Sequence, residues 1–364
     1  MSWLMRTAAC VPSGLISMGL LCGVACGWTL AGLQMADAGE PVARTPATKE
    51  LPLPGESWQV KGAPAFVMMP PENLRRSPQP WVWYAPTLPG LPDVHEKWMH
   101  ERFLAAGVAV AGIDVGESFG GPAGRSLFSD FYQEMTDKRG FSKKPVLLGR
   151  SRGGLMVCNW AVEHPDQVGA LVGIYPVFDF RTYPGLEKAA PAYGLSPQAL
   201  AEKSSQHNPI ERVASLAQAG VPVFLIHGDV DTVVPLRENS AELLKRYEAA
   251  GAGDAVRLVV PAGQGHNYWE GFFRCQELVD FAIHHASESW PKFRGPDGQG
   301  RVSVGHIPAT FSETENVLWK SAVPGRGWSS PVISQGVCWL TTAVAKDLTP
   351  EQRAEVIREK EATN

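Results

Sequence analysis

The stretch L-G-R-S-R-G-G at residues 148–154 places Ser151 between two arginines and among glycines. It fits the pattern G-x-S-x-G, follows the apolar run P-V-L-L and runs directly into the helical pattern G-L-M-V-C-N-W-A-V. A strand-to-helix turn this sharp exposes a serine hydroxyl, and Gly149 and Gly153 are needed because a side chain would clash where strand and helix cross. The pattern therefore predicts Ser151 as a nucleophile, with an ordinary glycine turn as the alternative.

A serine nucleophile requires a base, and the base requires an acid that orients it. V-F-L-I-H-G-D-V-D-T-V-V-P places Asp229 and Asp231 just past an apolar run, and L-V-V-P-A-G-Q-G-H-N-Y-W places His266 in a glycine-flanked loop past the next run. The carboxyl ends of parallel strands meet at one edge of a sheet, where the sites of α/β proteins lie. The order Ser, Asp, His therefore predicts a triad with His266 as base and one of the two aspartates as acid.

Acyl transfer also requires N–H donors for the oxyanion of the tetrahedral intermediate. The backbone N–H of Arg152 lies where the helix after the serine is expected to begin, so it is the first candidate donor. A second donor commonly comes from the loop after an early strand. That strand is W-V-W-Y-A-P, and the T-L-P-G-L-P loop after it suggests the backbone N–H of Thr87 or Leu88.

The arginines beside the serine allow two interpretations. Arg150 and Arg152 could bind an anionic substrate such as a uronate ester. Alternatively, the guanidinium groups could brace the turn by pairing with carboxylates such as Asp114, Glu117 or Asp179. We favour bracing because a partly buried arginine is usually paired.

Further side chains are candidates for substrate contact at the same edge. Glu117, in the loop G-E-S-F-G-G, could touch the substrate or hold the loop. Tyr175 and Trp269 could line the pocket or belong to packed aromatic core. No histidine pair has metal-ligand spacing beside a carboxylate, so the sequence predicts neither a metal nor another cofactor.

Apolar runs and helical periods alternate along most of the chain. Continuous apolar runs typical of central strands occupy 65–69, 80–85, 108–113, 145–148, 170–175, 221–227 and 256–260. Helical periodicity occupies 94–106, 126–139, 153–163, 209–219, 238–250 and 269–285. This alternation predicts an α/β fold with a doubly wound, mostly parallel sheet. A stretch at about 177–208 breaks the rhythm and could cap the carboxyl edge.

Residues 65–285 resemble the α/β-hydrolase superfamily, in its branch of secreted prolyl-oligopeptidase-like and esterase-like serine hydrolases. The motifs G-R-S-R-G-G, H-G-D-V-D-T-V-V-P and G-Q-G-H carry the resemblance. It implies that Asp231 is the acid of the triad, that Asp229 bonds the turn and that His227 is structural. The family's HGGG motif is absent, which argues against a lipase.

The N-terminal residues have the composition of an export signal. Arg6 is the only charge before Asp37, and A-D-A at 36–38 ends the apolar run. Residues 1–38 are therefore predicted as a signal peptide, with an uncleaved membrane anchor as the alternative. We expect a periplasmic, cell-surface or extracellular location.

The remaining segments have distinct compositions. A Pro-rich linker or arm is expected at 39–58, and the hydrolase-like domain at 59–289. W-P-K-F-R-G-P-D-G-Q-G and the tryptophan-rich residues after it, at 290–343, resemble the first blade of a PQQ-like β-propeller, which gives an incomplete all-β segment. A complete propeller needs several blades, so we expect this chain to be a truncated product of a longer protein. A charged helical tail is expected at 344–364, with Thr349 as N-cap.

The cysteines that follow the predicted signal are few. Cys158, Cys275 and Cys338 form an odd, sparse set, which argues against a disulfide framework. A Cys158–Cys275 bridge remains open. Cys158 lies in an apolar helical pattern, where a buried thiol is expected.

These observations predict an exported serine hydrolase that cleaves a carboxylic ester, with a carbohydrate ester as one candidate. Peptidase activity like that of prolyl oligopeptidases is the first alternative, disfavoured because no propeller precedes the domain. The second is a cell-envelope binding module without catalysis. The 364 residues carry a net charge of −4 and no Lys/Arg-dense stretch, which excludes a nucleic acid as the expected partner. The expected partner is a small-molecule or glycan ester. Contact with a membrane is expected only if the N-terminal segment remains uncleaved. The sequence does not predict an oligomeric state.

Overall fold

The computed structural model describes residues 49–287 without interruption and parts of the chain beyond. These parts are 293–294, 310, 312, 314–315, 317, 320–327, 329–334, 337–344 and 349–362. The predicted signal peptide, the first part of the arm and much of the predicted blade lie outside the described residues.

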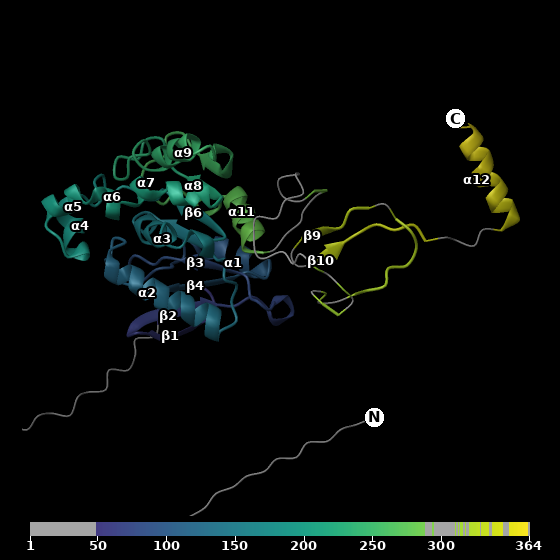
Figure 1. The fold of residues 1–364 in the computed structure, drawn as a ribbon, viewed down its shortest axis with the longest axis horizontal. Helices are drawn as coiled ribbons and strands as arrows, with labels where there is room; N and C mark the ends of the chain where they lie inside the picture. Colours follow the sequence, from purple (N-terminus) through teal and green to yellow (C-terminus); the bar gives the residue numbers. More distant parts are fainter. Residues whose placement is uncertain are drawn as a thin grey trace, which may run out of the picture. The chain divides into compact units, whose positions relative to one another are not determined.

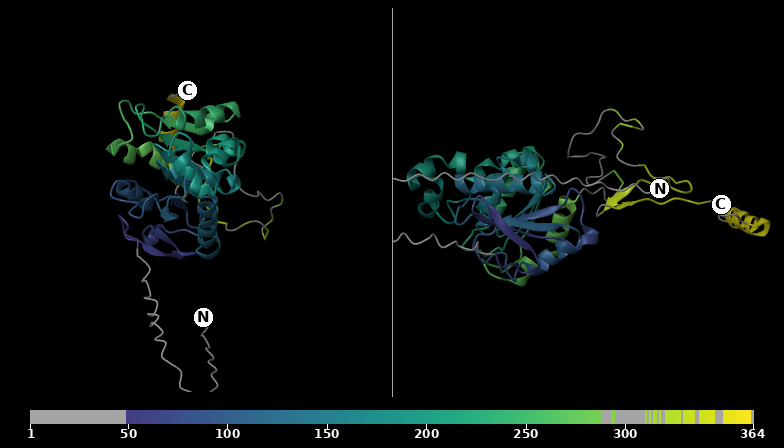
Figure 2. Two further views of the ribbon diagram at one scale, coloured as in Figure 1. Left: turned by 90° about the vertical axis from the view of Figure 1, so that its left-hand side faces the viewer. Right: turned by 90° about the horizontal axis from the view of Figure 1, so that it is seen from below.

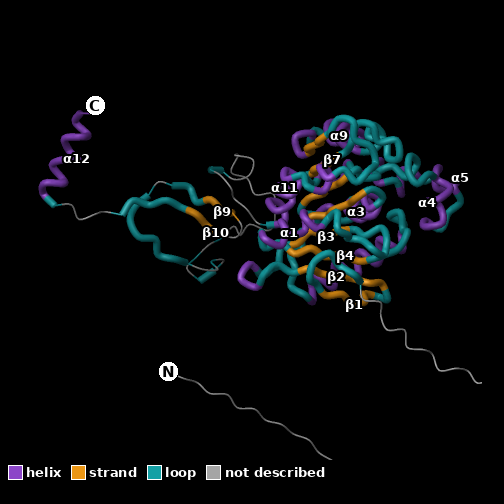
Figure 3. The backbone as a smooth tube through the Cα atoms, turned by 180° about the vertical axis from the view of Figure 1, so that it is seen from behind, coloured by secondary structure: helices purple, strands orange, loops and turns teal. Residues whose placement is uncertain are grey.

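An eight-stranded sheet forms the centre of the fold, in the order β1-β2-β4-β3-β5-β6-β7-β8. Its strands are β1 (Glu56–Val60), β2 (Ala63–Met68), β3 (Trp81–Tyr84), β4 (Ala109–Ile113), β5 (Val146–Arg150), β6 (Ala170–Ile174), β7 (Val223–Ile226) and β8 (Val256–Val259). The pairs β1/β2 and β2/β4 are antiparallel and all other pairs are parallel. Figure 3 shows β1, β2, β4, β3 and β7 following one another across the sheet. The predicted mostly parallel α/β architecture is confirmed.

Helices cover both faces of this sheet (Figures 1 and 2). One layer contains α1 (Lys97–Ala105) and α11 (Gln276–Ala286), and the other contains α2 (Pro122–Gln133), α3 (Gly153–Ala161), α8 (Ala214–Gln218) and α9 (Ser240–Ala249). Shorter helices are α7 (Pro209–Arg212) and α10 (Glu270–Phe273), and a π turn at Glu134–Lys138 extends α2. Single 3₁₀ turns lie at Glu72–Leu74, Pro165–Gln167 and Gly253–Ala255. The layers explain the continuous apolar runs, since both faces of each central strand need apolar side chains.

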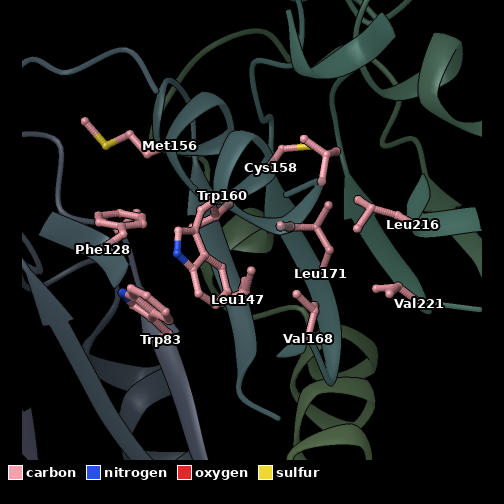
Figure 4. Packing of buried hydrophobic residues seen from close by; sticks show 14 of the residues in the cluster. Trp83, Phe128, Leu147, Met156, Cys158, Trp160, Val168, Leu171, Leu216 and Val221 are labelled. Carbon is pink, nitrogen blue, oxygen red and sulfur yellow. The ribbon is translucent and has the colours of Figure 1, made fainter. Parts of the chain in front are cut away.

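Alternate residues of the central strands point into different cores. In β3, Trp81 and Trp83 face α2 and α3, whereas Val82 and Tyr84 face α1 and α11. Figure 4 shows the first core, where the rings of Trp83 and Trp160 lie 4.8 Å apart. Large aromatic side chains thus hold the sheet against the helix that follows Ser151.

The stretch at about 177–208 forms a small helical insertion. It contains α4 (Leu186–Tyr193), α5 (Pro197–Glu202) and α6 (Ser204–His207). Its own core includes Phe180 and Leu200 and extends to Leu155 near the start of α3. The insertion is therefore anchored beside the turn that carries Ser151.

Strand β1 was not among the expected strands. It begins at Glu56, inside the predicted arm, so the folded part starts a few residues before 59. Its sequence E-S-W-Q-V is largely polar and only Val60 is buried, because β1 is an edge strand that pairs with β2 alone. Because an edge strand does not need a continuous apolar run, the search for such runs did not predict β1.

The described residues of the C-terminal segment include two short strands and a helix. β9 (Val332–Ser334) and β10 (Val337–Trp339) form an antiparallel pair, and α12 (Pro350–Ala362) lies in the predicted charged tail. The Thr349 N–H donates to Oε1 of Gln352 at 3.2 Å, and the Gln352 N–H lies 3.4 Å from Oγ1 of Thr349, the reciprocal arrangement of a capping box. Two strands are fewer than the four of a propeller blade, so the blade stays a prediction.

Two further features of the described residues bear on the sequence predictions. Cys158, Cys275 and Cys338 are free thiols, and Cys158 is buried. Among the helices described, none combines the length and apolar composition needed to cross a bilayer.

Helix α1 buries a histidine without polar partners. His100 is 0% exposed, and neither ring nitrogen has a hydrogen-bond partner within the described structure. Burial lowers the pKa of His100 from 6.5 to about 3. Between these pH values the unfolded chain binds the extra proton, so His100 destabilises the fold as pH falls from 6.5 toward 3.

We expect His100→Leu to remove this acid sensitivity. The wild-type free energy of unfolding should lose on the order of 2 kcal/mol more than the variant's between pH 8 and pH 5. Urea titrations at both pH values measure the difference. The matched change His164→Leu, at a partly exposed histidine, should keep the wild-type pH dependence. Parallel curves for wild type and His100→Leu would contradict the prediction.

Candidate active site

Ser151 occupies a strained turn between β5 and α3. Its φ is +50°, in the left-handed region that non-glycine residues seldom adopt. The Ser151 N–H donates to the Ile174 carbonyl at 3.0 Å, and the Val177 N–H donates to the Ser151 carbonyl at 2.8 Å. These bonds hold the turn against the end of β6, so the serine is presented at the carboxyl edge of the sheet.

Glycines permit the close approaches around this turn. A Cβ at Gly149 would lie 2.8 Å from the Gly154 nitrogen, and a Cβ at Gly154 would lie 2.6 Å from the Val177 carbonyl oxygen. Gly153 has more room, with the Ala85 carbonyl oxygen at 3.1 Å. A side chain at Gly149 would therefore clash, as the sequence predicted. Of the two glycines that follow Arg152, Gly154 leaves less space for a side chain than Gly153.

The structure brings Ser151, His266 and Asp231 together in one hydrogen-bonded line. Ser151 Oγ lies 2.9 Å from Nε2 of His266, and Nδ1 of His266 lies 2.8 Å from Oδ2 of Asp231. A carboxylate only accepts, so the proton sits on Nδ1, and Nε2 is free to accept from the serine. This is the arrangement in which an imidazole can act as general base toward a hydroxyl.

Asp231 is held as an ionised acceptor. Its Oδ1 accepts from the N–H groups of Val233 at 2.9 Å and Val234 at 2.8 Å, and its Oδ2 lies 3.4 Å from Nε2 of His227. Burial opposes the charge, but hydrogen bonds from His227, His266 and the Val234 N–H outweigh burial and keep the pKa of Asp231 well below its usual range. The carboxylate therefore stays charged while His266 gains and loses a proton.

The other two residues of this motif have the supporting roles that the resemblance implied. Asp229 Oδ1 accepts from the Gly263 N–H at 2.7 Å and so ties two loops together. His227 is fully buried, with Nε2 2.8 Å from the Val234 carbonyl and Nδ1 2.8 Å from Oγ of Ser240. Asp231, not Asp229, reaches His266.

The predicted oxyanion donors lie around the start of α3. Arg152 occupies the N-cap position of this helix, where backbone N–H groups lack intrahelical acceptors. The loop after β3 approaches from the other side: the Thr87 side chain would be 3.4 Å from a Cβ at Gly153, and Leu88 beside it is 49% exposed. Which of these two residues supplies the second N–H stays a prediction.

The Arg152 side chain connects three loops at the mouth of the site. It pairs with Glu117 at 2.8 Å, donates to the Tyr183 hydroxyl of the insertion at 3.3 Å, and lies 3.5 Å from the Thr87 carbonyl. Glu117 is thus one of the bracing partners expected from the sequence. Arg152, the residue after Ser151, therefore ties the Glu117 loop and the insertion to the start of α3.

Arg150 pairs with a residue that the sequence analysis did not suggest. Its Nη1 donates to Oε1 of Glu96 at 2.5 Å, and Glu96 is 0% exposed. Burial alone would lower the pKa of Arg150, but the Glu96 carboxylate raises it above its ordinary value, so the guanidinium stays charged. The other named carboxylates pair elsewhere, Asp114 with Lys49 and Asp179 with Arg181. Arg150 braces the turn, and its partner lies just before α1.

The two aromatic candidates differ in their surroundings. Tyr175 is 2% exposed, and its ring centroid lies 4.4 Å from that of His266, so it supports the imidazole from within instead of lining an open pocket. Trp269 is 41% exposed, and its indole packs edge-on against Phe272 at 5.3 Å. Trp269 is therefore available at the surface of the loop that carries His266.

A cavity that was not anticipated lies beside this loop. Its volume is about 400 Å³, and it is lined by Val94, His95, Lys97, Trp98, Glu101, Tyr268, Glu270, Phe273 and Arg274. The cavity separates the start of α1 from α10, and Tyr268 in its wall follows His266 by two residues. No run of similar residues marks it in the sequence. Within residues 49–287 and the other described parts, no cluster of three or more His, Cys, Asp or Glu side chains could hold a metal ion.

Comparisons with known proteins bear on the fold and on the class of enzyme. The model of the prolyl oligopeptidase family (Peptidase_S9) matches residues 128–287, less than half of the chain. No curated protein matches the sequence. Among solved structures, Est1E of Butyrivibrio proteoclasticus is 18% identical with a TM-score of 0.50, over 64% of this chain and 98% of Est1E.

Two further structures illustrate the range of similar proteins. Mycobacterium tuberculosis MPT51 is 15% identical with a TM-score of 0.51, over 65% of this chain and 100% of MPT51. Dipeptidyl peptidase 4 of Porphyromonas gingivalis is 14% identical with a TM-score of 0.50, over 64% of this chain and 35% of the peptidase. These structures show the α/β-hydrolase fold. The family match supports a serine hydrolase.

Proposed function

We propose that this protein is an exported serine hydrolase that cleaves a carboxylic ester through an acyl-enzyme. The observation that carries the proposal is the line from Ser151 Oγ through His266 to Asp231, with links of 2.9 Å and 2.8 Å. A hydroxyl, an imidazole and an ionised carboxylate in this order are the groups that acyl transfer requires.

In this mechanism Ser151 Oγ attacks the carbonyl carbon while Nε2 of His266 takes the serine proton. The oxyanion is stabilised by the Arg152 N–H and by one N–H of the Thr87–Leu88 loop. His266 then gives its proton to the leaving alcohol as the carbon–oxygen bond breaks. A water molecule, activated by the same imidazole, releases the acid and regenerates Ser151. Asp231 keeps Nδ1 protonated and stabilises the imidazolium throughout.

A carbohydrate ester is the substrate class that we propose first. Arg152 donates hydrogen bonds, Glu117 accepts them, and the Tyr183 hydroxyl does both at the mouth of the site. Such a surround suits a substrate with several hydroxyl groups. The family match favours a second candidate, a peptidase acting on amide bonds by the same steps.

A fluorophosphonate probe and a substrate panel test this proposal. Wild-type protein should be labelled at Ser151, whereas Ser151→Ala should not be labelled. Acyl esters, acetylated and feruloylated glycans and peptide amides then distinguish an esterase from a peptidase by their relative kcat/KM. If wild type is as unreactive as Ser151→Ala, the enzyme proposal fails and the alternative of a binding module without catalysis gains support.

Export and the propeller blade remain proposals that rest on the sequence. The apolar N-terminus with A-D-A at 36–38 supports secretion, with a mature chain beginning at Gly39. Sequencing the N-terminus of the protein from its native cells would test this. The tryptophan-rich residues at 290–343 support a first blade of a PQQ-like propeller.

A further inference from the structure

Two residues at the edge of the sheet share an unusual backbone conformation. Ser151 follows β5 with a φ of +50°, and Tyr175 follows the neighbouring strand β6 with a φ of +35°. Tyrosine is a bulky residue that seldom adopts positive φ, and such strain persists only where the surroundings enforce it. A strained serine is explained by its exposure as a nucleophile, whereas the strain at Tyr175 requires another explanation.

The contacts of the Tyr175 side chain supply that explanation. Its ring lies 4.4 Å from the His266 ring and packs edge-on against Phe272 at 5.0 Å. The ring also packs against that of Phe273 at 6.3 Å, and the Arg150 guanidinium lies over the same Phe273 ring at 5.1 Å. In the sheet, Arg150 of β5 pairs with Ile174, the residue before Tyr175. The side chain is 2% exposed; it packs directly against the imidazole and is linked to the buried cation through Phe273.

Arg150 is itself fixed on several sides. Its guanidinium donates to Glu96, whose Oε1 also accepts from the Tyr84 hydroxyl at 3.0 Å and whose Oε2 accepts from the Asp93 N–H at 3.0 Å. The rings of Tyr268 and Phe273 lie 5.0 Å and 5.1 Å from the guanidinium carbon. Both oxygens of Glu96 are therefore in use, and the cation is enclosed by aromatic side chains.

We propose that Glu96, Arg150 and Tyr175 form a positioning array that holds the imidazole of His266. The array rests on the proposed function, because it matters only if His266 acts as a base. The groups that contact His266 are Ser151, Asp231 and Tyr175. Beyond these, His227 lies against Asp231, and the Arg150–Glu96 pair lies against Tyr175.

This array complements the bond to Asp231. A single hydrogen bond at Nδ1 leaves the imidazole free to tilt about that bond, and a small misplacement of a reacting group can cost a large factor in rate. The Tyr175 ring limits the tilt from one side. The ring also offers its π electrons to the imidazolium that forms when His266 takes the serine proton.

Fluorophosphonate labelling of Ser151 as a function of pH tests the array without a known substrate. We expect Tyr175→Leu, which removes the ring, to lower the second-order labelling rate by about tenfold or more. Its pH profile should also shift, with an apparent pKa lower by about half a pH unit, because the imidazolium loses a ring face. Tyr175→Phe, which keeps the ring but removes the hydroxyl, should fall between wild type and Tyr175→Leu.

The matched control is Tyr247→Phe. Tyr247 is fully buried, and its hydroxyl donates to the Val221 carbonyl at 3.2 Å. The substitution therefore removes a buried tyrosine hydroxyl in the core on the other face of the sheet from Tyr175. Its labelling rate and pH profile should match those of wild type. An equal shift in Tyr247→Phe would overturn the proposal, because the effect would then be one of general stability.

The remaining members of the array are tested together, since loss of Arg150 alone leaves a buried carboxylate. The double variant Glu96→Gln/Arg150→Met should label as slowly as Tyr175→Phe, and adding Tyr175→Phe to it should cause no further loss. Additive losses, or labelling of Tyr175→Leu at the wild-type rate and pH profile, would overturn the array. Failure of wild type to label at all would instead overturn the proposed function.

Discussion

Asp231→Asn is expected to lower kcat/KM by a factor on the order of 10⁴ while the protein stays folded. The structure explains why so small a change should have so large an effect. Oδ1 of Asp231 accepts from the N–H groups of Val233 and Val234, so the amide oxygen of an asparagine must take that position. Its NH₂ group would then face His266. A donor at Nδ1 forces the proton onto Nε2, where the imidazole can no longer accept the proton of Ser151.

Steady-state kinetics on the best substrate of the panel, together with thermal unfolding, would measure this effect. Asp229→Asn is the matched control, because its side-chain oxygen can still accept from the Gly263 N–H. The control should retain activity within a few-fold of wild type. Equal losses in the two variants would assign the effect to the loop and not to the triad.

Arg150→Met is expected to destabilise the protein by about 3–5 kcal/mol. The substitution removes the cation that neutralises Glu96, a carboxylate with 0% exposure, while its bonds from Tyr84 and Asp93 remain. Replacing one partner of a buried ion pair costs more stability than replacing both partners, because the charge that remains is buried without a counterion. Glu96→Gln/Arg150→Met should therefore regain most of the lost free energy of unfolding.

Urea unfolding of the single and double variants would show this pattern through the midpoint concentration at constant slope. Lys138→Met provides the comparison at the surface, since Lys138 pairs with Glu134 at 2.8 Å but is 73% exposed. Its loss should leave the midpoint concentration close to that of wild type, because an exposed ion pair is screened by solvent. A small effect of Arg150→Met, similar to that of Lys138→Met, would contradict the prediction.

The central strands and most helices were predictable because their signals are local. Strands β2 to β7 are buried or nearly so, and their residues form apolar runs that only a sheet covered on both faces requires. The edge strand β8 is partly exposed but still carries three apolar residues. Helix continuity was less predictable. Helical periodicity at 269–285 predicted one continuous helix. The structure instead has two helices, α10 and α11, separated by Arg274 and Cys275. Periodicity reports which side chains are buried, but it does not detect one or two non-helical residues between short helices.

The site was predictable to the extent that chain order and motif fix it. Ser151, Asp231 and His266 each follow a recognisable strand, so their meeting at one edge follows from the topology. Glu96 gave no such signal, because it lies in a polar stretch before a helix and reaches Arg150 only after β3 and β5 have paired. The support that Tyr175 gives to His266 likewise depends on a backbone conformation that the sequence does not reveal.

The pairing of Arg150 with Glu96 also limits whether the segment that carries Ser151, Asp231 and His266 could be exchanged between related proteins. The family match begins at residue 128, yet Glu96, the Thr87 loop and strands β1 to β4 all precede that point. A chain exchanged between relatives at residue 128 would bring Arg150 next to a foreign segment, and β5 would pair with a foreign β3. A functional chimera would therefore have to supply an acid at the position of Glu96, or give up both charges together.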